Sequence, residues 1–124
     1  MSAVLPAQVN IEPTCLHADN AWRAALAAGE AQERTVTGAH LSIGVTVMRR
    51  GEATTSSEAP MGEEVATVLE GDFRVDAAGE SYELSPGEGI VIPPREPRVW
   101  TCLTERGALY RVITRLDNLP PKLP

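Results

Sequence analysis

The chain contains few residues of several chemically informative types. Its 124 residues include two cysteines, two histidines, two tryptophans, two tyrosines and one phenylalanine. Because aromatic side chains are scarce, the hydrophobic core has to be built mainly from Val, Leu, Ile and Ala. Cys15 and Cys102 are far apart in a sequence with no visible secretion signal. This placement predicts two free thiols rather than a disulfide.

Basic clusters and long apolar runs are also missing. The formal net charge is −6, and the densest basic run is the pair Arg49-Arg50. Binding of nucleic acid requires a positively charged surface, so the sequence excludes such a partner. The apolar runs are much shorter than the roughly 18 residues that a membrane span needs. The first ten residues have no basic segment followed by an apolar one. We therefore expect a soluble, cytoplasmic protein without a membrane partner.

The clearest pattern in the chain is an apolar alternation of period two. Leu41, Ile43, Val45 and Val47 alternate with smaller or more polar residues, which predicts a half-buried strand over 41–48. Further short strands are expected at 65–69, 73–76, 81–84, 90–92, 99–103 and 109–114. Glycine and proline each occur ten times, many of them between these segments, and they favour tight turns. Many short strands at regular spacing predict a sandwich or a barrel.

One short helix is expected over residues 19–28. Asp19 is a suitable N-cap, Trp22 and Leu26 share one face with Ala25, and Gly29 follows the last turn. A helix this short needs tertiary packing to be stable, so we expect it to cover a mouth or an edge of the barrel. The sequence thus divides into an N-terminal extension with the helix (1–32), a barrel (33–116) and a proline-rich tail (117–124).

Two segments resemble the conserved motifs of the cupin superfamily. In the first motif, a glycine precedes a His-x-His pair, a glutamate and a closing glycine, and Gly51, Glu64 and Gly71 occupy the glycine and glutamate positions. In the second motif, Gly87 and Pro93 match the leading glycine and the proline. The resemblance covers roughly residues 44–114. It implies an all-β fold: a cupin-type jelly-roll barrel of two antiparallel sheets with one short N-terminal helix.

The positions of the cupin metal ligands carry other residues. Two registers are open for the His-x-His pair, which falls either on Ser57 and Ala59 or on Glu58 and Pro60. The third histidine falls on Arg98, and a guanidinium cannot act as a metal ligand. The second-motif glycine and asparagine fall on Arg95 and Cys102. Of the four metal ligands usual in the family, three histidines and one glutamate, this sequence keeps only the glutamate, Glu64. The resemblance therefore implies a protein without a metal or another cofactor.

Four residues are candidates for binding a small ligand inside the barrel. Arg98 can recognise a carboxylate or a phosphate, or it can form a buried ion pair with Glu64. Glu64 and Ser57 can supply hydrogen bonds to a ligand. Trp100 and Cys102 alternate with Arg98 and so share its face, where Trp100 can line a pocket or fill the core.

Two functional hypotheses from different classes are open. In the first, the chain is a metal-free cupin that binds a small polar or anionic ligand. In the second, it is a metal-independent lyase, dehydratase or epimerase acting on a sugar-like or carboxylated substrate, with Glu64 or His40 as the proton carrier. A structural role with a filled barrel is a third possibility. The resemblance also implies a homodimer, because pairing would protect an open sheet edge.

Overall fold

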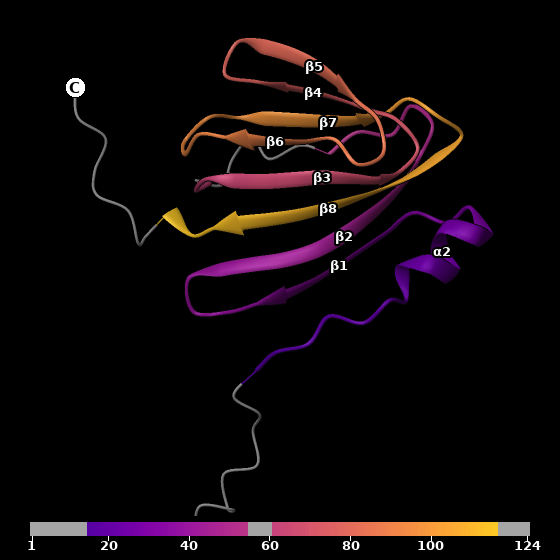
Figure 1. Ribbon diagram of the computed structural model, residues 1–124, viewed down its shortest axis with the longest axis horizontal. Coiled ribbons are helices and arrows are strands. Elements are labelled where there is room, and N and C mark those ends of the chain that lie inside the picture. Colours follow the sequence, from indigo (N-terminus) through magenta and orange to yellow (C-terminus); the bar gives the residue numbers. More distant parts are fainter. Residues whose placement is uncertain (1–14, 55–60, 117–124) are drawn as a thin grey trace, which may run out of the picture.

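The computed structural model describes residues 15–54 and 61–116 (Figure 1). This part of the chain forms one helix, α2 (Trp22–Ala28), and eight strands. The strands are β1 (Gln32–Thr37), β2 (Leu41–Arg49), β3 (Glu64–Glu70), β4 (Phe73–Ala77), β5 (Glu80–Leu84), β6 (Gly89–Ile92), β7 (Arg98–Cys102) and β8 (Arg106–Thr114).

The strands form two antiparallel sheets. The larger sheet has the order β1-β2-β8-β3-β6, and the smaller sheet has the order β5-β4-β7. Strands that are neighbours in the larger sheet, such as β3 and β8, are far apart in the sequence. Figure 1 shows the two sheets one above the other, with β6 and β7 at their junction. The expected fold class, a mostly β structure of two antiparallel sheets with one short helix, is confirmed.

Strand β1 is the element that the apolar pattern did not predict as a separate strand. Its sequence, QERTVT, contains a single large apolar residue, Val36, and most of its side chains are exposed. Among the described strands it pairs with β2 alone, at the edge of the larger sheet. An edge strand of this kind is held mainly by backbone hydrogen bonds, which leave no apolar periodicity in the sequence.

The core lies between the two sheets. It is formed by buried side chains from the facing surfaces: Met48, Ala66, Val68, Phe73, Val75, Leu84, Ile92, Trp100, Cys102 and Leu109. Phe73 and Trp100 pack edge to face, with ring centroids 6.3 Å apart and an interplanar angle of 79°. Such an arrangement is favourable for aromatic pairs beyond the apolar area that they bury. Two large aromatic side chains thus compensate for the low aromatic content.

Helix α2 begins later than the sequence indicated. It starts at Trp22, and Ala21 is its N-cap with no side-chain capping bond. Asp19 instead accepts a hydrogen bond from the backbone N–H of Ala21 (3.0 Å) and pairs with Arg34, so the expected cap at Asp19 is wrong. The expected end is confirmed, because Gly29 adopts a left-handed conformation with φ 70°.

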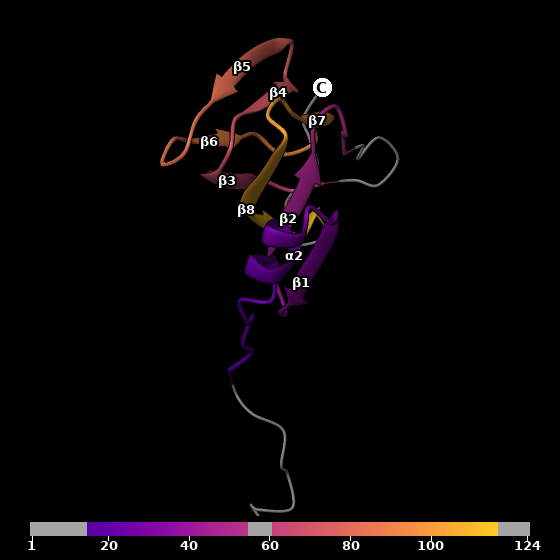
Figure 2. The ribbon, with the colours of Figure 1, turned by 90° about the vertical axis from the view of Figure 1, so that its right-hand side faces the viewer.

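The apolar side of α2 packs on the outer face of the larger sheet rather than over a mouth of the barrel. Ala25 is buried against Val47 and Ala108, with Trp22 and Leu26 beside them. Figure 2 shows the helix next to β1 and β2. The remainder of this outer face carries a row of apolar residues, one per strand, whose members are paired across the sheet: Val36, Ile43, Val112, Val65 and Val91. Val65 and Val91 are 46% and 58% exposed.

Some expectations concern residues outside the described ranges. Ser57, Ala59, Glu58 and Pro60 belong to this group, so the two possible registers of the His-x-His pair stay open. The tail 117–124 and most of the N-terminal extension also lie outside, and the three-part division of the chain stays a prediction. Within residues 15–54 and 61–116, no helix is long and apolar enough to cross a membrane.

Candidate functional site

A buried cluster of charged residues lies on the inner face of the barrel. Glu64 is the first residue of β3, and Arg98 is the first residue of β7 in the opposite sheet. Arg111 belongs to β8 and is paired with Ala66, two residues after Glu64. Residues two apart on a strand point to the same face, so Glu64 and Arg111 meet diagonally across β3 and β8. We refer to Glu64, Arg98 and Arg111 as the polar cluster.

Both oxygens of Glu64 accept two hydrogen bonds each. Oε1 accepts from Nη1 of Arg98 (3.2 Å) and from Nη2 of Arg111 (3.0 Å). Oε2 accepts from Nε of Arg111 (2.7 Å) and from the indole Nε1 of Trp100 (3.2 Å). A carboxylate offers about four acceptor positions, so these four bonds saturate it. Glu64 is fully buried, and its charge is therefore stabilised entirely by its neighbours.

Arg98 holds three backbone carbonyl groups as well as Glu64. Its Nε donates to the carbonyl of Glu96 (2.9 Å), Nη2 donates to that of Pro93 (3.0 Å), and Nη1 also reaches that of Gly62 (3.3 Å). Its side chain is 0% exposed. These contacts fix the β6–β7 loop and the segment before β3 against each other. Of the two roles open for Arg98, the buried ion pair is present, and ligand binding stays a prediction.

Arg111 is the member of the cluster that the sequence analysis did not identify. Its Nε and Nη2 bind Glu64 side by side, and within the described residues its Nη1 donates no hydrogen bond. The side chain is 9% exposed, whereas those of Glu64 and Arg98 are 0% exposed. No cupin motif includes this position. One feature of the sequence could have identified it: Arg111 alternates with Leu109 and Ile113, so it occupies a position on β8 that faces the barrel interior.

Trp100 connects the polar cluster to the apolar core. It is fully buried, its indole N–H donates to Glu64, and its ring packs against Phe73. The prediction that Arg98, Trp100 and Cys102 share one face is confirmed, because all three are buried while Val99 and Thr101 are only half-buried.

Cys102 and His40 lie apart from the polar cluster. The Cys102 thiol is near the carbonyls of Thr104 (3.3 Å) and Met48 (3.6 Å), and burial raises the pKa of this thiol above its usual value. Both Cys15 and Cys102 are free, as predicted. His40 is exposed in the β1–β2 turn, and no side-chain hydrogen bond of the described residues connects it to Glu64. The structure thus brings Glu64, Arg98 and Trp100 together and leaves His40 outside.

Arg95 adopts an unusual backbone conformation next to the site. Its φ is 66°, in the left-handed region that favours glycine. In the resemblance to the second cupin motif, the motif's second glycine falls on this position. Its backbone N–H donates to the carbonyl of Met61 (2.8 Å), which ties the β6–β7 loop to the segment before β3. The turn geometry is therefore present although an arginine occupies the position.

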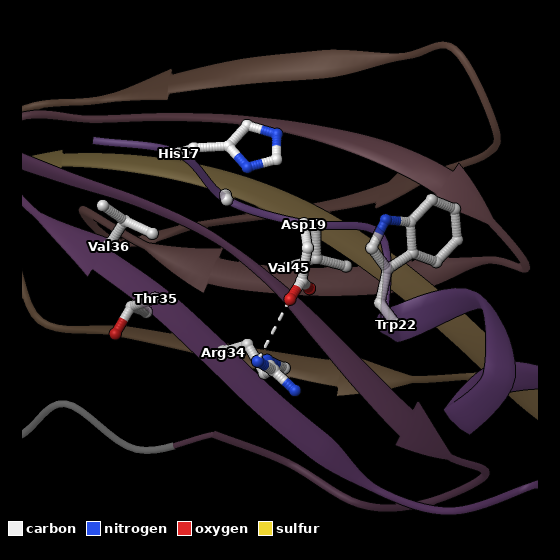
Figure 3. Close-up of a pocket in the computed structure, with 8 residues that line it drawn as sticks. His17, Asp19, Trp22, Arg34, Thr35, Val36 and Val45 are labelled. Carbon is white, nitrogen blue, oxygen red and sulfur yellow. Dashed lines mark hydrogen bonds and ion pairs between the residues drawn. The ribbon is translucent and has the colours of Figure 1, made fainter. Parts of the chain in front are cut away.

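A separate hollow lies on the outer face of the larger sheet, beside α2 (Figure 3). Its cavity volume is about 80 Å³, and its lining includes His17, Asp19, Trp22, Arg34 and Val36. Nη2 of Arg34 pairs with Oδ2 of Asp19 across it (3.3 Å). A water molecule takes about 30 Å³ in the liquid, so the hollow has room for only two or three waters.

The geometry first defines the class of protein. Two antiparallel sheets enclose one core, and the inner face carries polar residues at one end, as in jelly-roll barrels. The family model described as "Cupin domain" matches residues 44–113, more than half of the chain. The chain therefore belongs to the cupin family, as the motifs indicated.

Individual proteins show the same relationship. The chain is 37% identical over 80 residues to "Polyketide synthase CurC" of Streptomyces cyaneus, a match that covers 64% of this chain and 51% of that protein. It thus spans about half the length of this curated relative. The structure of SPY1581 from Streptococcus pyogenes, a conserved protein of unknown function, is similar with a TM-score of 0.63 and 21% identity, covering 99% of this chain and 98% of that one. KdgF from Halomonas sp. gives a TM-score of 0.59 and 24% identity, covering 72% of this chain and 84% of that one.

Proposed function

We propose that this cupin domain works without a metal ion and binds a small anionic ligand inside the barrel. The observation that carries the proposal is the saturation of the buried carboxylate of Glu64 by Arg98, Arg111 and Trp100. Two guanidinium groups next to this carboxylate make the inner face a more favourable environment for an anion than for a cation.

The chemistry of the available donors supports the first half of the proposal. A metal ion needs lone pairs, and those of Glu64 are used by N–H donors. Arg98 has no lone pair to give and would repel a cation. Within residues 15–54 and 61–116, no group of three or more His, Cys, Asp or Glu side chains is arranged to hold a metal. The residues at this position do not fit a metal ion.

The second half of the proposal assigns roles to the predicted ligand-binding residues. Arg98 and Glu64 supply the charges next to the ligand, and Trp100, which is itself fully buried, supplies the apolar backing behind them. Ser57, which lies outside the described residues, supplies a hydroxyl hydrogen bond.

The proposal also includes a homodimer. The apolar row on the outer face of the larger sheet would be covered by a second copy, and Val91→Asp would then convert the dimer to a monomer in light scattering.

A metal-independent enzyme is the second candidate, and the similarity to "Polyketide synthase CurC" favours it. In this version the ligand is a carboxylated or polyketide-derived substrate that undergoes elimination or epimerisation. The saturated Glu64 is a poor proton carrier, because its acceptor positions are already occupied. In this version the proton carrier is His40, the other predicted candidate, or another group near the ligand; His40 is exposed in the β1–β2 turn.

The decisive experiment combines elemental analysis with ligand binding. Protein without an affinity tag is analysed by mass spectrometry for Fe, Mn, Ni, Cu and Zn, before and after loading with each ion. We expect less than stoichiometric metal and melting temperatures that rise with small carboxylates but not with their neutral amides. A tightly held stoichiometric ion would overturn the metal-free proposal. Turnover of a bound acid, detected by mass spectrometry, would favour the enzyme.

A further inference from the structure

One edge of the Arg111 guanidinium is hydrogen-bonded to Glu64, and the other edge has no partner among the described residues. A guanidinium can bind a carboxylate through Nε and one terminal nitrogen, or through its two terminal nitrogens. In Arg111 the first edge, Nε and Nη2, binds Glu64 at 2.7 and 3.0 Å. The second edge consists of Nη1 and the remaining N–H of Nη2. Within the described residues, Nη1 has no hydrogen-bond partner, so this edge is available.

The available edge is also accessible. Among the described residues, the one buried side-chain nitrogen or oxygen without a hydrogen-bond partner is Oε1 of Gln32. Nη1 of Arg111 also has no hydrogen-bond partner among the described residues but is not one of these buried atoms, so part of its surface is accessible. The small exposed fraction of the Arg111 side chain, 9%, agrees with this.

Arg98 and Glu64 hold this edge in place. Arg98 is anchored to three backbone carbonyls and fixes one oxygen of Glu64. Glu64 in turn binds two nitrogens of Arg111 and so fixes the plane of its guanidinium. A group positioned in advance by such contacts loses little conformational entropy when a ligand binds.

We infer that Arg111 is the residue that contacts the ligand, that Arg98 and Glu64 are positioning residues, and that the ligand carries a carboxylate. This inference rests on the proposed function and deepens it. A carboxylate is planar, and its two oxygens match the two parallel N–H bonds of a guanidinium edge. The resulting arrangement is a guanidinium between two carboxylates, Glu64 on one edge and the ligand on the other.

The first test uses the unmodified sequence. Protein labelled with ¹⁵N-arginine is titrated with acetate and benzoate, and the assigned Nε–H signals are followed by NMR. We expect the Arg111 signal to shift with saturation, while the signal of Arg74, whose Nε binds Asp76 on the outer surface at 3.2 Å, stays unchanged. Acetamide and benzamide, which lack the charge, should give no shift. A saturable shift at other arginines alone would overturn the assignment to Arg111 and leave anion binding in place.

The second test uses Arg111→Lys, which keeps the positive charge beside Glu64 and removes the planar edge. We expect carboxylate binding at least about tenfold weaker than in the unmodified protein, with unchanged circular dichroism. Arg74→Lys is the matched control and should bind normally. Equal affinity in Arg111→Lys would overturn the inference but not the proposed function. Absence of any anion binding in the unmodified protein would overturn both, and stronger binding of inorganic phosphate than of benzoate would overturn the carboxylate class alone.

Discussion

The two ends of the barrel interior are built on the same strands from opposite kinds of side chain. On β7, Arg98 lies at the polar end, opposite Ala77 of β4, while Cys102 lies at the other end, opposite Phe73. On β3, Glu64 and Val68 are separated in the same way. The apolar end is held by packing that any side chain of similar shape can provide. The polar end is held by directed bonds that depend on each other, because one carboxylate serves three donors.

This difference has an energetic consequence. Removing an atom from the apolar end loses a share of packing and leaves a cavity, with a cost that grows with its volume. Removing one partner from the polar end leaves buried charges without compensation, which costs more than the lost bond itself. The two ends should therefore respond differently to substitutions of equal size.

The largest expected effect comes from removing the carboxylate. Glu64→Gln keeps the side-chain shape but leaves the guanidinium groups of Arg98 and Arg111 without their shared counter-charge. We expect the free energy of unfolding to fall by about 3–5 kcal/mol in urea titrations. Leu109→Ala at the apolar end is the comparison, with an expected loss of about 2–5 kcal/mol that does not change with pH. A loss below about 1 kcal/mol for Glu64→Gln would contradict the larger cost expected at the polar end.

A smaller effect is expected at the residue that joins the two ends. Trp100→Phe keeps an aromatic ring against Phe73 but removes the indole N–H from Glu64. The loss should be about 1–3 kcal/mol, the usual cost of leaving a buried hydrogen-bonding group without its partner. Thermal unfolding of Trp100→Phe alone and combined with Glu64→Gln checks the assignment. The second substitution should add much less in the combined variant than it does alone, because both act on the same bond.

The third prediction concerns the buried thiol at the apolar end. Burial raises the pKa of Cys102, so the folded state keeps this proton more firmly than the unfolded state. Its contribution to stability is fully present below the unfolded cysteine pKa and is lost as the pH rises through the folded value. We expect a decline in melting temperature between pH 8 and pH 10, about the range of thiol titration, and a shallower decline in Cys102→Ala. Iodoacetamide should modify exposed Cys15 much faster than Cys102 in the same sample.

The smallest effect is expected at an exposed ion pair. Arg49 lowers the pKa of Glu52 by donating hydrogen bonds to its carboxylate, the shortest at 2.7 Å. The stabilisation is present above the unfolded glutamate pKa and is lost as the pH falls through the folded value. Glu52→Gln should therefore change the melting temperature only slightly at pH 7 and should flatten its acid dependence. A loss as large as that of Glu64→Gln would contradict the distinction between buried and exposed pairs.

The fold could be predicted because its signals are local. Strands β2 to β7 were expected within one residue of their ends, and β8 was expected to begin three residues later than it does, since alternation and turn residues mark each of them. Edge strand β1 was missed because its QERTVT sequence has no alternation. The start of α2 was placed too early: Asp19 accepts a hydrogen bond from the backbone N–H of Ala21, but the helix begins only at Trp22.

The candidate site could be predicted only in part. Arg98, Glu64 and Trp100 were found because cupin motifs and strand alternation point to them. Arg111 was missed because its importance comes from its contact with Glu64 across the paired strands β8 and β3, and these two residues are 47 positions apart in the sequence. Such a contact is a property of the sheet order and not of any local pattern.

The built-in positive charge of the polar cluster has a consequence for regulation. A guanidinium carries its charge without a bound ion, and it has no alternative oxidation state. Supply of a cation, exchange of one ion for another, chelation and oxidation cannot change Arg98 or Arg111. The positive charge of these two side chains is therefore encoded in the sequence, and a change in metal supply or redox state leaves it unaltered.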